Sequence, residues 1–445
     1  MVARLFETFE KNEVMKSVST LSRSPWSWVP TLYLAEGIPY VAVMSIAVIM
    51  YDRMGISHTD IAFYTAWLYL PWVIKPLWSP FVDILRTRRW WIVAMQFLVG
   101  AAMAGVALTL PAPFFFRATL AFFWLMAFSS ATHDIAADGF YMLALDTHQQ
   151  SFFVGIRSTF YRIAMIAGQG LLVMLAGLFE VYTRVEVAWL LTFGIMALLF
   201  FVFAFYHLFL LPRPQADKAS AVAAADIWRE LGETFRSFFR KPGIGVALLF
   251  LLTYRLAEAQ LVKMSSLFLL DARPDGGLAL TTGQVGFVYG TVGVIALTVG
   301  GLIGGWVVSR YGLRRCLWPM ALMLTLPNLV YVYLSLLQPD SLVVVNACVA
   351  VEQLGYGFGF TAYMLYMISF SEGAHATAHY ALCTAFMALG MMLPGMVAGW
   401  IADWVGYTFF FVWIMICTLP VFVLLPFLKI PENFGLKSPG NKSEK

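Results

Sequence analysis

Residues 118–143 read ATLAFFWLMAFSSATHDIAADGFYML, and this stretch decides what kind of protein the chain forms. A helix of this length spans about 39 Å at 1.5 Å per residue, which exceeds the ~30 Å hydrocarbon core of a bilayer. Its first half is apolar, but Asp134 and Asp138 lie in its second half. The stretch predicts a membrane-spanning helix whose carboxylates face the interior of a helix bundle and not lipid.

Similar apolar stretches make up most of the rest of the chain. Hydrophobic residues account for 60% of the sequence and charged residues for 12%, whereas about 25% of the residues in a soluble domain are charged. We predict an all-α membrane protein with twelve transmembrane helices in two six-helix lobes. The expected spans are 27–50, 61–83, 90–110, 118–143, 153–178, 187–211, 244–270, 284–308, 315–337, 341–370, 378–403 and 407–429.

One long polar segment lies between the spans and divides the chain. We expect an N-terminal lobe at 1–211, a cytoplasmic linker at 212–241, and a C-terminal lobe at 242–445 that ends in a short cytoplasmic tail. Within the linker, residues 227–239 have the pattern of a short amphipathic helix on the membrane surface. A plain tether without a transport role is the alternative.

The distribution of basic residues predicts the orientation of the chain. An even number of spans places both termini on one side, and most of the 29 Lys and Arg residues lie on that side. By the positive-inside rule, that side is the cytoplasm. The net charge of +4 follows from this bias in the loops and gives no reason to expect a nucleic-acid partner.

Asp134 and Asp138 are one helical turn apart and therefore share a face of their helix. Two carboxylates this close cannot both ionise at low cost, so one of them can take up and release a proton. The alternative is a static clamp, in which both acids stay ionised and pair with Arg157 and Arg162 on the next span. The residues alone leave both readings open.

Other ionisable and polar side chains inside the spans complete the set of candidates. Glu36 lies beside Gly37 and Pro39, which loosen the helix, although a salt bridge to Lys75 is an alternative role. The proton-coupling candidates are Asp134, Asp138, Glu36 and Glu352. The substrate-binding candidates are Lys75, Arg162, Arg255, Glu258, Lys263, Tyr40, Tyr254, Gln353 and Tyr356. No catalytic residue, metal site or cofactor is expected, and the chain is not predicted to be an enzyme.

Two short basic loops follow spans 2 and 8. Asp83 and Arg86 lie in the first loop, and Arg310 and Arg314 lie in the second. The pair resembles, in degraded form, the Gly-x-x-x-Asp-x-x-Gly-Arg-Arg loop of the major facilitator superfamily. In that family the loop stabilises one conformation, which implies a conformational switch here. Topogenic positive charge alone is the other reading.

Longer strings are similar to one branch of this superfamily, the AmpG-type muropeptide permeases. The strings that carry the likeness are LPWVIKPLWSPFVD at 70–83, AFSSATHDIAAD at 127–138, YRIAM at 161–165 and EQLGYGFG at 352–359. The resemblance runs from about Trp28 to Phe427.

The resemblance implies a monomeric, proton-driven symporter in the bacterial inner membrane. Such a protein imports anhydromuropeptides, or their disaccharide, by alternating access for peptidoglycan recycling. Permeases for other oligosaccharides, or for an acetyl-CoA-like anion, share much of the pattern. A lipid flippase and a polytopic membrane enzyme are alternatives from other classes, and His133 beside Asp134 is the only hint of an enzyme.

The predicted orientation can be tested with single cysteines and a membrane-impermeant thiol reagent in intact cells. Cysteines that replace Gln150 or Ser220 lie in even-numbered loops and should stay unlabelled. Cysteines that replace Thr183 or Asp340 lie in odd-numbered loops and should react. The reverse labelling pattern would invert the predicted topology.

Overall fold

The computed structural model describes residues 24–145, 147–214, 217, 224–373, 376–432 and 434–435. Within these ranges the chain is helical and contains no β-strand. Ten helical stretches are long and apolar enough to cross a membrane. The all-helical membrane fold expected from the sequence is therefore confirmed.

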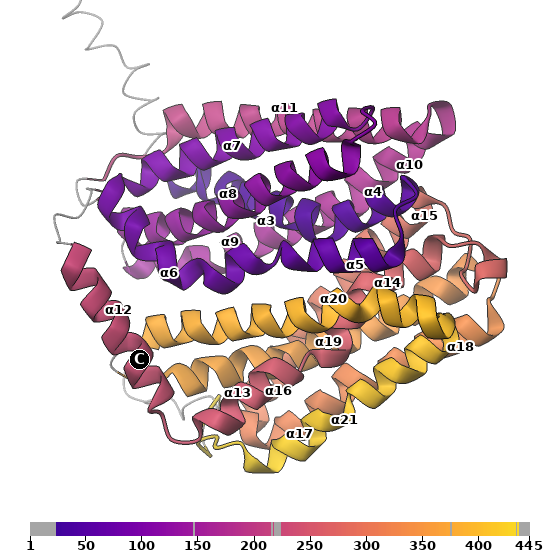
Figure 1. Ribbon diagram of the computed structural model, residues 1–445. Helices are drawn as coiled ribbons and strands as arrows, with labels where there is room; N and C mark the ends of the chain where they lie inside the picture. The colour runs from indigo at the N-terminus through magenta and orange to yellow at the C-terminus, as the bar shows by residue number, and fades with distance from the viewer. Residues whose placement is uncertain are drawn as a thin grey trace, which may run out of the picture. The chain divides into compact units, whose positions relative to one another are not determined.

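The helices of the first half follow the apolar stretches of the sequence (Figure 1). They are α3 (Val29–Val41), α4 (Ala47–Arg53), α5 (His58–Trp67), α6 (Leu70–Leu85), α7 (Arg88–Thr109), α8 (Phe115–Ala144), α9 (Thr147–Met165), α10 (Val173–Tyr182) and α11 (Val185–Leu210).

The second half begins with the linker helix α12 and ends with α21. Its helices are α12 (Ala224–Phe239), α13 (Ile244–Thr253), α14 (Leu256–Leu270), α15 (Thr282–Val285), α16 (Val294–Tyr311), α17 (Leu313–Thr325), α18 (Leu329–Leu337), α19 (Leu342–Ser371), α20 (Ala376–Cys417) and α21 (Leu419–Leu424).

Two local features explain why the structure has ten long helical stretches where twelve spans were expected. The second expected span is interrupted at Leu68 and Tyr69, which leaves α5 and α6 with 10 and 16 residues. The last two expected spans form one stretch, Ala378–Phe427, that turns at Gly406, where φ is 77°. The number twelve and the boundaries of the two lobes stay predictions.

The described part of the chain forms two compact units, and the first comprises residues up to Tyr40, Trp78–Met165 and Leu190–Ala221. Its core is aromatic, and Trp28 packs edge-on against Phe140 at a centroid distance of 5.3 Å. In this unit α7 and α8 lie side by side (Figure 1). The Gln96 side chain on α7 bonds His133 on α8 and His207 on α11, both at 2.9 Å. His133 therefore has a polar partner inside the core.

The second unit joins Val41–Leu77 and Ile166–Trp189 to Val222–Lys445. Segments of the first half of the chain thus pack within the same unit as the second half. The unit's apolar core includes Phe250 and Tyr363, which pack with ring centroids 5.8 Å apart. The linker helix α12 adds Phe238, which is buried and stacks on Phe386 of α20. The helix expected at 227–239 is present, and a role at the membrane surface stays a prediction.

Three π-helical segments interrupt the helices of the second unit: η2 (Ala42–Ile46), η3 (Ile166–Leu172) and η5 (Gly286–Gly293). The backbones of η3 and η5 come close together because glycines leave no side chains between them. A Cβ atom added to Gly290 would lie 2.0 Å from the backbone nitrogen of Gly170. These glycines allow η3, from the first half of the chain, to contact η5, from the second half.

We expect Gly290→Ala to destabilise the second unit, because the added methyl group has no space beside Gly170. Overpacking of this kind costs about 1–3 kcal/mol. The measurement is the apparent unfolding temperature of the purified protein in detergent. Gly305→Ala is the matched control, since a Cβ there meets no atom within 4 Å. Equal unfolding temperatures for the two variants would contradict the close packing of η3 and η5.

Candidate functional site

The first unit buries a pair of carboxyl groups that come from different helices. Glu36 projects from the middle of α3 and is 9% exposed, and Asp134 lies on α8. The two carboxyl groups lie within hydrogen-bonding reach of each other. A hydrogen bond between them needs a proton on one of the two groups, since neither ionised carboxylate can donate. The pair is therefore able to hold one exchangeable proton.

Asp138, one turn further along α8, has a different set of partners. Its Oδ1 atom is 2.8 Å from the guanidinium of Arg157 on α9 and 3.3 Å from the hydroxyl of Tyr33 on α3. The Arg157 guanidinium also lies over the rings of Tyr33 and Tyr141, at 4.5 and 5.2 Å from their centroids. Asp138 and Arg157 thus form an ion pair enclosed by aromatic rings.

These contacts change the relation expected between the two acids of α8. From the sequence we expected Asp134 and Asp138 to act as one pair. In the structure Asp134 lies beside Glu36, and Asp138 forms an ion pair with Arg157. Arg162 is half-buried on α9, and within the described ranges it makes no ion pair or hydrogen bond. Arg157, and not Arg162, is the arginine that holds a carboxylate of α8.

A second group of buried acids lies in the second unit. Glu352 on α19 is 1% exposed, and its Oε2 atom accepts hydrogen bonds from the Tyr331 hydroxyl at 3.3 Å and from Gln353 at 2.9 Å. The Tyr331 hydroxyl in turn bonds the hydroxyl of Tyr289. Glu258 on α14 is buried close enough for its charge to interact with that of Glu352. Both side chains that donate hydrogen bonds to Glu352, Tyr331 and Gln353, are neutral.

A break in a helix positions the Arg255 side chain. The helical stretch Ile244–Leu270 is interrupted at Tyr254 and Arg255, where α13 ends and α14 begins. The Arg255 guanidinium donates to the Tyr356 hydroxyl and lies 5.0 Å from the centroid of the Phe360 ring. Tyr254 is buried and donates to the backbone of Gly359, so it has a packing role at the same break.

The remaining substrate candidates differ in burial. Lys263 is 1% exposed, donates to Thr65 at 2.9 Å and lies over the Tyr69 ring, so it is already engaged by α5 and its neighbour. Lys75 and Tyr40 are half-buried.

The candidates of the two basic loops lie at the surface. Arg86 is exposed and lies over Trp90, Arg310 is exposed, and Arg314 pairs with Glu432. The side chain of Asp83 lies outside the described residues. The carboxylate of Asp217, in the linker, accepts hydrogen bonds from the backbone N–H groups of Arg88 and Arg89 at the start of α7. Here a linker carboxylate caps a helix N-terminus.

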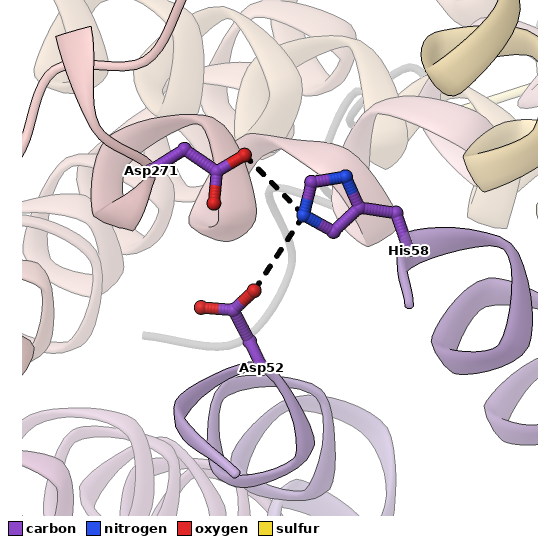
Figure 2. Close-up of side chains that lie close together, drawn as sticks. All are labelled: Asp52, His58 and Asp271. Atoms are coloured by element: carbon purple, nitrogen blue, oxygen red, sulfur yellow. Dashed lines mark ion pairs between the residues drawn. The ribbon is translucent and has the colours of Figure 1, made fainter. Parts of the chain in front are cut away.

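An ionic cluster in the second unit was not predicted from the sequence. Figure 2 shows the His58 imidazole between the carboxylates of Asp52 and Asp271. Its Nε2 atom is 3.6 Å from Asp52 and 3.3 Å from Asp271, while Nδ1 lies 3.2 Å from Asp403. His58 lies just before the span expected at 61–83. Burial alone would lower its pKa, but the hydrogen bonds and charges of Asp271 and Asp52 outweigh burial and raise the pKa to about 10.

A cavity of about 580 Å³ lies next to this cluster and is lined in part by Asp52 and Asp271. Glu180 also lines it and accepts hydrogen bonds from Arg53 at 3.3 Å, from Thr282 at 2.6 Å and from Trp189 at 3.0 Å. Glu180 therefore connects α10 with α4, α15 and α11. Segments from both halves of the chain meet here through polar contacts.

Sequence reasoning missed His58, Asp52 and Asp271, which lie at helix ends, and Asp403, which lies just before the turn at Gly406, because charge is common at such positions and carries little information. Tyr33 was also left out. Arg157 was named only as a partner in the static clamp and not as a coupling or substrate candidate.

Long apolar helices that enclose acids, arginines and helix breaks define a multi-pass membrane transporter. The model of the Major Facilitator Superfamily matches residues 31–379. The chain belongs to this family.

Known relatives agree with this assignment and with the AmpG-type resemblance. The chain is 25% identical to a transporter named AmpG 4 from Rickettsia conorii, over 90% of this chain and 96% of the relative. It is 27% identical to the anhydromuropeptide permease of Escherichia coli K12, over 82% of this chain and 73% of the permease. The fold is similar to that of a bacterial homologue of the human lysosomal transporter Spinster, with a TM-score of 0.68 at 15% identity over 91% and 96% of the two chains.

We expect the ion pair between Asp138 and Arg157 to show measurable coupling in a double-mutant cycle with Asp138→Asn and Arg157→Gln. The pair is partly exposed, so the coupling should be about 1 kcal/mol. It would be measured as a non-additive change in the apparent unfolding temperature. The control cycle uses Asp340→Asn and Arg273→Gln, because Asp340 is 95% exposed and its pair should show little coupling. Additive effects at Asp138 and Arg157 would argue against a structural ion pair.

Proposed function

We propose that this protein is a proton-coupled symporter that imports an anhydromuropeptide, or a related sugar-containing solute, by alternating access. The observation that carries the proposal is that the carboxyl groups of Glu36, which is buried, and of Asp134 lie within hydrogen-bonding reach of each other. It supplies a place for one proton inside a helical membrane protein of a transporter family.

The neighbouring ion pair supports a coupling role for these acids. Asp138 is neutralised by Arg157, so it is suited to remain ionised while Glu36 and Asp134 share a proton. A proton on this pair removes one negative charge from the interior of the first unit. Such a change in charge can alter the relative free energies of two conformations, which is the requirement for coupling.

The cationic side chains support an anionic substrate. Arg162 is half-buried and has no ion-pair partner among the described residues, so a substrate carboxylate can pair with it. Arg255 lies beside the rings of Tyr356 and Phe360, a setting in which a sugar ring can stack next to a charged group. The relative named anhydromuropeptide permease suggests this class of solute.

The remaining parts of the proposal concern the place of the protein in the cell. We propose that it is a monomer in the bacterial inner membrane with both termini in the cytoplasm. The excess of basic residues on the side of the termini supports this orientation. The end of the second unit that contains Asp52, His58 and Asp271 then faces the periplasm.

Uptake by proteoliposomes with an imposed pH gradient tests the coupling site. Asp134→Asn and Glu36→Gln should each abolish uphill accumulation but retain counterflow exchange, because substrate still binds while the shared proton is lost. Glu352→Gln tests the competing acid of the second unit, and Asp340→Asn is an exposed acid-to-amide control. Full gradient-driven accumulation in both Asp134→Asn and Glu36→Gln would exclude this pair as the coupling site.

The same vesicles can identify the solute. Labelled anhydro-disaccharide, its peptide conjugates and neutral disaccharides should be compared with and without the gradient. We expect a preference for the anhydro-sugars. Accumulation of neutral disaccharides alone would favour an oligosaccharide permease of another specificity.

A further inference from the structure

We propose that Asp52, His58 and Asp271 form a binding site for one divalent transition-metal cation such as Zn²⁺. The three residues come from α4, from the start of α5 and from the residue that follows α14 (Figure 2). Each offers one ligand atom, and these atoms all lie within 4.8 Å of one another. The binding itself does not depend on the transport function proposed above.

The two distances from His58 Nε2 match those between ligand atoms of one tetrahedral metal ion. A hydrogen bond between an imidazolium and a carboxylate is about 2.7–2.9 Å long. The His58 Nε2 atom is 3.3 Å from Asp271 and 3.6 Å from Asp52, and its single N–H cannot point at both. Ligand atoms about 2.0–2.2 Å from a tetrahedral Zn²⁺ lie about 3.3–3.6 Å from one another.

The surrounding side chains orient the proposed ligands. The Nδ1 atom of His58 faces Asp403 at 3.2 Å, and the Thr59 hydroxyl donates to the other oxygen of Asp403 at 2.7 Å. A carboxylate on the distal nitrogen is the usual support for a metal-binding histidine, because it holds the Nδ1 proton in place when the metal displaces the proton on Nε2. The Tyr407 hydroxyl donates to Asp271 at 2.7 Å and holds that carboxylate in place.

Charge and access favour a cation at the same point. Three carboxylates, those of Asp52, Asp271 and Asp403, surround one imidazole. Arg53, the nearest arginine in the sequence, pairs with Glu180. The adjacent cavity of about 580 Å³ reaches Asp52 and Asp271, so a hydrated ion can approach and water can fill the fourth coordination position.

The test is calorimetric titration of ZnCl₂ into the purified full-length protein in detergent, after removal of any affinity tag and treatment with a chelator. We expect saturable binding of one Zn²⁺ in the micromolar range or tighter. His58→Gln and Asp271→Asn should each weaken binding at least tenfold. Mg²⁺ should compete only weakly, because one of the three ligands is an imidazole nitrogen, which binds Zn²⁺ far better than Mg²⁺.

Two further variants separate metal binding from folding defects. Asp403→Asn keeps all three ligands but removes the carboxylate that faces Nδ1 of His58, and should weaken Zn²⁺ binding by about 10–100-fold. Asp340→Asn lies outside the cluster and should bind as the wild type does. The rise in unfolding temperature on adding Zn²⁺ provides a second readout for each variant. Absence of saturable binding by the wild type, or unchanged binding by His58→Gln, would overturn the proposal.

If the transport proposal also holds, a bound ion would join segments from the two halves of the chain and should slow uptake in wild-type vesicles. His58→Gln should relieve this inhibition. Because calorimetry requires no transport, a negative binding result refutes the metal site and leaves the proposed function untouched. Binding without inhibition of uptake would refute only the link between the two.

Discussion

The structure depends on one constraint, which is that the bilayer core offers no water to a charged or polar group. An ion placed there without a partner costs about 3 kcal/mol, so its helix must turn it toward another side chain. Arg157 meets this requirement with Asp138 and two tyrosine rings, and Lys263 meets it with Thr65 and Tyr69. The rotation of α9 and of α14 about their axes therefore follows from their ions as much as from their apolar faces.

The same constraint explains why helix breaks coincide with polar positions. A broken turn releases backbone groups that must find new partners inside the protein. At Tyr254 and Arg255 the break lies beside α19, where the Tyr254 hydroxyl bonds the carbonyl oxygen of Gly359 and Arg255 reaches Tyr356. The π-helical segments η3 and η5 lie against each other through Gly170 and Gly290. Irregular backbone is thus placed where the protein itself surrounds it.

Helix positions could be predicted from the sequence to within a few residues, because the length of an apolar run sets them. The span expected at 118–143 is α8, Phe115–Ala144, and the span expected at 341–370 is α19, Leu342–Ser371. Partners could not be predicted in the same way. Asp134 lies beside Glu36, almost a hundred positions earlier, and His58 meets Asp271 more than two hundred positions later. Such pairs depend on helix order and rotation, which one sequence does not reveal.

The contacts of the His58 cluster are ionic, unlike those of an apolar core, and ionic contacts are suited to an interface that opens. Apolar surface resists separation in proportion to its area, whereas ions that separate into water recover hydration. The contacts of His58 with Asp52, Asp271 and Asp403 are long and partly exposed, and the glycines of η3 and η5 touch without interlocking side chains. A protein that alternates between two conformations needs both states within a few kcal/mol of each other. In the proposed alternating-access cycle, contacts of this kind would hold the segments together in one state without making that state irreversible.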